Sequence, residues 1–180
     1  MRPAHRRHPL RAPQRLVQLP HDRVRRGRPA GPAHPPHPAE RAARESRWKT
    51  LAALLGEIPG TVPQGRDPRC EINPHYMAMF TLDPQVHPGL DRDLVVRALV
   101  AEGLPAFVNY PPVYRTEAFR SVPGPGTEEL AERNPVGELL GRRGIWLHHR
   151  VLLGTDDDCA DVAEALSKVL TGLTAQRNPV

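Results

Sequence analysis

Tyr110, Tyr114 and Arg115 form the first group of side chains whose types and spacing could do chemistry. They flank Pro111-Pro112, which follows an apolar segment of strand length. Proline cannot donate to a strand ladder, so the pair ends the strand and opens a loop. A loop at a strand end is a usual place for substrate contacts, and an ordinary surface loop is the alternative.

His148, His149 and Arg150 form the second group, directly after the apolar segment around Trp146. Adjacent strand residues point to opposite faces, so we expect that the two imidazoles cannot easily chelate one metal ion. One histidine together with Arg150 could face a pocket that holds a carboxylate or a phosphate. The alternative is one partly buried histidine and one surface histidine.

Other polar patterns point to structure rather than catalysis. Asn73 to His75 could form the edge of a pocket, and Asp156 to Asp158 suit the first turn of a helix better than a metal site. Gly124 to Gly126 lack the Lys-Ser/Thr of a phosphate loop. Cys70 and Cys159 are far apart and fit two reduced thiols. No serine, histidine and acid arrangement indicates a triad.

Hydrophobic spacing predicts the elements that position these groups. Asp91 and Thr155 stand where helix N-caps belong, and Gly103 stands where a helix ends. The pattern predicts an α/β fold of the α+β kind, a short sheet covered by helices. The expected order is helix 41–55, strand 76–82, helix 91–103, strand 104–110, helix 127–140, strand 145–147 and helix 155–170.

Composition changes at about residue 47. Residues 1–47 hold 12 arginines and nine prolines against three acidic residues, whereas the rest of the chain carries a net charge of −4. Burial of the few apolar side chains in this segment cannot offset the entropy cost of ordering its backbone, about 1–2 kcal/mol per residue. We therefore expect a disordered basic leader. Three interpretations are open: a nucleic-acid-binding tail, an organelle targeting peptide, and the translation of a GC-rich gene out of frame.

The remaining roughly 130 residues are enough for one modest core. The sequence has no run of 18 apolar residues and no apolar stretch after its basic start. We therefore expect a cytoplasmic protein with no membrane partner and no secretory signal.

Several motifs in a fixed order resemble one enzyme family. Together they are similar to the C-terminal domain of the DegT–StrS sugar aminotransferases, especially antibiotic-pathway members such as scyllo-inosose aminotransferases and aminohydroxybenzoate synthases. The motifs are Arg47 to Gly60, His75-Tyr76, Glu102 to Ala106, Tyr110 to Phe119 and Trp146 to Gly154.

The resemblance implies a fold type I enzyme that uses pyridoxal 5'-phosphate (PLP), forms a homodimer, and transfers an amino group from an amino-acid donor to a keto-sugar or keto-cyclitol. In the family, a large N-terminal domain carries the lysine that binds the cofactor. The only lysines here, Lys49 and Lys168, do not match it, so we expect that this chain alone does not bind PLP. The motif match places Tyr110, Tyr114, His148, His149 and Arg150 around the substrate.

The leader contains a hidden family motif. With one choice of synonymous codons, the string that encodes Gln18 to Gly27 gives Asn-Tyr-Arg-Met-Thr-Glu-Phe-Ala-Ala when it is read one nucleotide later. The family has such a segment just before the C-terminal domain. The match favours a frameshifted leader.

We therefore expect a leader over residues 1–40, an aminotransferase small domain over 41–173 and a tail over 174–180. The predicted function is that of a truncated sugar or cyclitol aminotransferase, which keeps the substrate-side small domain and is inactive alone. The alternative is a non-enzymatic binding module with a basic N-terminal arm for nucleic acid, which would bind in a salt-dependent manner.

Overall fold

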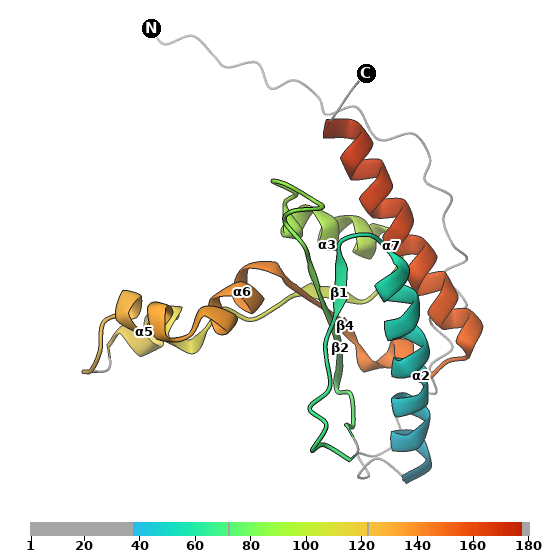
Figure 1. Ribbon diagram of the computed structural model, residues 1–180, viewed down its shortest axis with the longest axis horizontal. Coiled ribbons are helices and arrows are strands. Elements are labelled where there is room, and N and C mark those ends of the chain that lie inside the picture. The colour runs from blue at the N-terminus through green and yellow to red at the C-terminus, as the bar shows by residue number, and fades with distance from the viewer. Residues whose placement is uncertain (1–37, 72, 122, 178–180) are drawn as a thin grey trace, which may run out of the picture.

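A four-stranded antiparallel sheet lies at the centre of the protein (Figure 1). The computed structural model describes residues 38–71, 73–121 and 123–177. The sheet has the order β1-β2-β4-β3, and Ala78 of β2 and Ala106 of β3 both pair with Leu147 of β4. The strands are β1 (Thr61–Pro63), β2 (Met77–Leu82), β3 (Ala106–Val108) and β4 (Gly144–His148).

Three helices cover one face of this sheet. Inward residues alternate along the strands, as the pleat requires, and pack on the helices in one core. In β2 the inward residues are Ala78, Phe80 and Leu82. The covering helices are α2 (Pro38–Glu57), α3 (Arg92–Ala101) and α7 (Asp156–Arg177).

The predicted caps are confirmed at two of these helices. Asp91 accepts a hydrogen bond from the backbone N–H of Asp93 at the start of α3. Before α7, the hydroxyl oxygen of Thr155 accepts from the N–H of Asp158, and the carboxylate of Asp158 accepts from the N–H of Thr155. This reciprocal arrangement is a capping box, and it fixes where α7 begins.

Residues 109–121 and 123–143 belong to an arm that extends away from the sheet on the side opposite α2 and α7 (Figure 1). The helix expected over 127–140 is wrong in detail, because it is two helices. Asn134 leaves the helical conformation (φ −130°, ψ 56°), and Pro135 begins the second helix, where its missing N–H costs nothing. Gly141 consequently lies inside that helix and not past its end. The arm contains the 3-10 turn η1 (Val113–Arg115), α4 (Glu117–Arg120), α5 (Thr127–Arg133) and α6 (Pro135–Arg143).

The predicted mixed fold is confirmed, with differences at element ends. β1 was not expected. The strand expected over 104–110 covers only Ala106–Val108, and Pro105 before it has no N–H to donate to a ladder. Residues 38–40 of the expected leader form the first turn of α2, and the other leader residues lie outside the described part of the chain. At the other end, α7 continues to Arg177 and so includes residues 174–177 of the expected tail. Among the described residues, no helix is long and apolar enough to cross a membrane.

Candidate functional site

The open face of the sheet carries large side chains. Met79, Trp146 and Phe107 lie opposite one another on β2, β4 and β3 and form one row across this face. Phe107 keeps 43% of its surface exposed, although it is in the sheet. Large apolar groups left open on a soluble domain indicate a contact surface.

Stacked rings extend this row into what we call the aromatic stripe. It holds four of the eight Phe, Trp and Tyr residues of the chain. The ring of Trp146 lies 4.3 Å from that of Phe107 and 6.2 Å from that of Tyr110. The indole N–H of Trp146 donates to the carbonyl of Val108 over 2.9 Å, which fixes the ring. The stripe consists of Tyr110, Phe107, Trp146, His148, His149 and Tyr76.

The structure places the two predicted tyrosines differently. Tyr110 is 68% exposed and belongs to the stripe. Tyr114 is buried in η1, and its hydroxyl donates to the Oε1 atom of Glu138 over 2.9 Å. Arg115 donates to the same oxygen, and its hydrogen bond lowers the pKa of Glu138. In the described chain, Tyr114 and Arg115 therefore tie η1 to α6.

The predicted histidines do lie together. The expectation that they point apart does not hold, because β4 ends at His148 and the chain turns at once into the 3-10 turn η2 (His149–Leu152). Their ring centroids are 4.1 Å apart, and the Nδ1 atom of His148 accepts from the N–H of Arg150. Burial, followed by the charge of Arg150, lowers the pKa of His148, so this ring is neutral at pH 7.

Tyr76 is a site residue that the sequence analysis missed. Its ring is 68% exposed and stacks on His149 at 5.6 Å. The preceding His75 has a left-handed backbone (φ 45°), which is rare for a residue with a side chain. His75 is held there by Glu45 at 2.7 Å and by the ring of Trp48. The strained turn directs Tyr76 outward, and only the His75-Tyr76 motif hinted at it.

The five predicted site residues thus fall into three groups. Tyr110 lies beside Trp146, His148 to Arg150 lie at the other end of β4, and Tyr114 is buried in the arm. Trp146 and His148 share the open face of β4, two residues apart, and link the first two groups, whereas His149 and Tyr76 lie past the strand end, where η2 packs against α2. Tyr114 is the member that the structure does not bring to this face.

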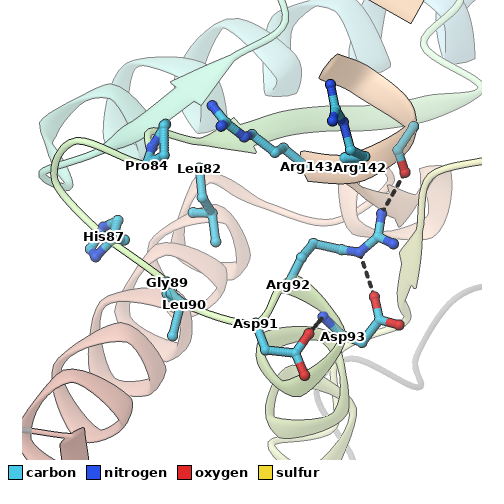
Figure 2. Close-up of a pocket in the computed structure, with 11 residues that line it drawn as sticks. Leu82, Pro84, His87, Gly89, Leu90, Asp91, Arg92, Asp93, Arg142 and Arg143 are labelled. Carbon is cyan, nitrogen blue, oxygen red and sulfur yellow. Dashed lines mark hydrogen bonds and ion pairs between the residues drawn. The ribbon is translucent and has the colours of Figure 1, made fainter. Parts of the chain in front are cut away.

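Apart from the open face, a hollow of about 490 Å³ lies between the start of α3 and the end of α6 (Figure 2). Arg92 crosses it and donates to the carbonyls of Gly141 and Gly144, each at 3.1 Å, as well as to Asp93. Arg92 satisfies carbonyls at the end of α6, so its role is to hold the arm against α3.

The described residues include no group of three or more His, Cys, Asp or Glu side chains placed to hold a metal ion. The carboxylate of Asp158 caps the start of α7, and that of Asp156 forms an ion pair with Arg47 at 3.0 Å. Cys159 is buried, and burial raises the pKa of its thiol to about 11, so the thiol is unreactive at neutral pH.

Comparison with known proteins assigns the chain to a family. Residues 38–167 match the DegT/DnrJ/EryC1/StrS aminotransferase family. The chain is 41% identical over 128 residues to 3-amino-5-hydroxybenzoate synthase of Amycolatopsis mediterranei, an alignment that covers 68% of this chain and 32% of that protein. It is 34% identical over 131 residues to L-glutamine:2-deoxy-scyllo-inosose aminotransferase of Streptomyces kanamyceticus, which covers 67% and 30%.

Among solved structures, the chain is similar to crystalline 3-amino-5-hydroxybenzoic acid synthase, with a TM-score of 0.67 and 38% identity over 74% of this chain and 35% of that one. The chain thus spans about a third of the length of the relatives that it matches. The similarity to the antibiotic-pathway enzymes expected from the motifs is confirmed. The chain belongs to the DegT/DnrJ/EryC1/StrS aminotransferase family.

Proposed function

We propose that this chain supplies the substrate-side small domain of a sugar or cyclitol aminotransferase, and that its aromatic stripe faces the rest of the enzyme and the substrate. The observation that carries the proposal is the row of rings on the open sheet face, where Phe107 and Tyr110 stack on Trp146 and β4 leads on to His148 and Arg150. Flat rings can lie against the face of a sugar or cyclitol ring, while imidazole and guanidinium groups can bind its oxygens.

The family uses PLP, whose chemistry needs a lysine amine. The described residues do not fit this group. Lys49 is on the outer surface of α2 with its side chain 71% exposed, 4.0 Å from Glu45. Lys168 on α7 forms an ion pair with Glu102 at 2.9 Å. Neither amine adjoins the aromatic stripe, so we assign cofactor binding to a part of the enzyme that is not among the described residues.

The test is to incubate the full chain with PLP, reduce with borohydride, and locate any pyridoxyl-lysine by mass spectrometry. Lys49→Arg and Lys168→Arg variants control for casual reaction of exposed amines. We expect no stoichiometric adduct and no transamination. A single fully modified lysine, together with amino transfer from glutamine or glutamate to a keto-cyclitol, would refute the assignment.

The substrate class follows from the relatives. The names of the relatives point to keto-cyclitols and to an aminobenzoate precursor as substrates. The name of the scyllo-inosose aminotransferase also gives L-glutamine as the amino donor. We propose a keto-sugar or keto-cyclitol substrate, an amino-acid donor and a homodimeric enzyme. Val113 and Val136, each 66% exposed on the arm, offer apolar surface for a second subunit.

We also propose that the leader, residues 1–40, arises from a shifted reading frame. Sequencing the gene across codons 18–45 and upstream tests it. A second frame that encodes the Asn-Tyr-Arg-Met motif after a lysine-bearing domain is the expected result. An uninterrupted gene without such a frame, or salt-dependent DNA binding that disappears when residues 1–37 are removed, would favour the basic-arm alternative.

A further inference from the structure

Arg44 is a charged residue in a position where α2 otherwise carries apolar side chains. The buried residues of α2 are Arg44, Trp48, Leu51 and Leu55, which follow one another at helical spacing on the core side. Only 7% of Arg44 is exposed. Its Nε and Nη2 atoms are buried and have no hydrogen-bond partner among the described residues. A buried charge without a partner is strongly unfavourable, so an acceptor is missing here.

The nearest carboxylate on the helix cannot fill this role. Glu45 is already used on both oxygens: Oε1 accepts from Arg66, and Oε2 binds the Nε2 atom of His75 at 2.7 Å. The charged groups around this end of the sheet are Arg44, Arg66 and Arg150 against Glu45. The local excess of positive charge favours an anion.

The Nδ1 atom of His149 is a second buried atom here without a hydrogen bond to the described residues, although the ring is hydrogen-bonded to the backbone of Tyr76. Helix α2 packs against η2, which begins at His149. Burial, then the neighbouring charges of His148 and Arg44, lowers the pKa of His149, so its ring is neutral at pH 7. The hydrogen bond with the backbone of Tyr76 raises the pKa and uses the proton of the neutral ring, so Nδ1 becomes a donor when the ring gains a second proton, which a bound anion favours.

We propose that Arg44 and His149 form a binding site for a carboxylate, between the start of α2 and the end of β4. The Nε–H and one Nη2–H of a guanidinium lie on the same edge and match the two oxygens of a carboxylate. The Nδ1–H of His149 supplies a third donor once the bound carboxylate stabilises the protonated ring, so binding should raise the pKa of this ring. One guanidinium balances one monoanion, whereas a phosphate dianion would need more charge.

A carboxylate would reach Arg44 and His149 beside Tyr76. The donor atoms have no contact with solvent, so a carboxylate must displace a side chain. Tyr76 rests on His149 and is 68% exposed, which makes it the side chain that can swing aside. The carboxylate comes either from a small molecule or from an Asp or Glu side chain of a second copy of this chain.

Thermal unfolding of the full chain tests the site, with sodium acetate compared with sodium chloride at equal ionic strength. The variant is Arg44→Met, which keeps the length of the side chain and removes the charge. The control is Arg41→Met, one turn earlier on the same helix and only half-buried. Without acetate, we expect Arg44→Met to unfold at a higher temperature than the parent, because it removes an unpaired buried charge.

Acetate should raise the unfolding temperature of the parent and of Arg41→Met, and the rise should be lost in Arg44→Met. NMR titration of the His149 ring, assigned with His149→Gln, should show its pKa rising when acetate binds. A dimer that Arg44→Met dissociates, without an acetate effect, would identify the carboxylate as that of a second copy. A lower unfolding temperature for Arg44→Met, with neither an acetate effect nor a dimer, would overturn the site.

Discussion

Two phenylalanines on opposite faces of the sheet test its division into a buried and an open face. Phe80 of β2 is 2% exposed and packs in the core, whereas Phe107 of β3 is 43% exposed on the open face. Phe80→Ala removes a complete core side chain and should cost about 3–5 kcal/mol. Phe107→Ala loses mainly the stacking on Trp146 at 4.3 Å, which is worth about 0.5–1.5 kcal/mol.

Urea unfolding followed by circular dichroism measures both costs in the same protein. A domain of this size has about 5–15 kcal/mol of stability in total, so Phe80→Ala should leave the chain close to unfolding, while Phe107→Ala should not. Phe107→Tyr serves as the matched control and should be near neutral. If Phe107→Ala destabilised the chain as much as Phe80→Ala, the face would not be open, and the proposed contact surface would lose its basis.

Two further predictions concern titration and thiol reactivity. The pKa values of His75, His148 and His149 are lowered, mainly by burial, so these rings favour the neutral form in the folded protein. Their contribution to stability is complete above about pH 6.5, the pKa of an unfolded histidine. It is lost as the pH falls toward and through the lower pKa values of the folded protein. The urea midpoint should therefore decrease when the pH is lowered from 7.5 to 5.5, and the decrease should be smaller in His149→Gln. Equal decreases in the parent and the variant would contradict the burial of this ring. With its pKa near 11, Cys159 should resist iodoacetamide at pH 8 while the half-exposed Cys70 reacts, as peptide mass spectrometry would show, and equal rates would contradict this prediction.

The sequence predicted the regular elements well where local chemistry decides them. Asp91 and Thr155 are caps because their side-chain oxygens satisfy N–H groups of the first turn, and this depends on neighbours in the chain. β2 was predicted within one residue because a short apolar run of strand length is followed directly by a turn region. β1 was missed because three residues that include Pro63 are too short for a pattern.

The site was harder to predict because it depends on contacts distant in sequence. Tyr114 matched a family motif, but its hydroxyl is used by Glu138, 24 residues later. Tyr76 is outward because Glu45, 30 residues earlier, holds the strained His75. The buried Nε and Nη2 atoms of Arg44 lack hydrogen-bond partners within the described chain, and the spacing of apolar residues along α2 could not predict this.

The most direct test of the central proposal is a chimera. In 3-amino-5-hydroxybenzoate synthase of Amycolatopsis mediterranei, the matched third would be replaced by residues 38–177 of this chain. We expect the chimera to bind PLP and to transaminate, and Trp146→Ala within it to lower kcat/KM while PLP binding persists. A chimera that folds and binds PLP, yet transfers no amino group from any donor to either class of keto substrate, would contradict the assignment of this chain as a substrate-side domain.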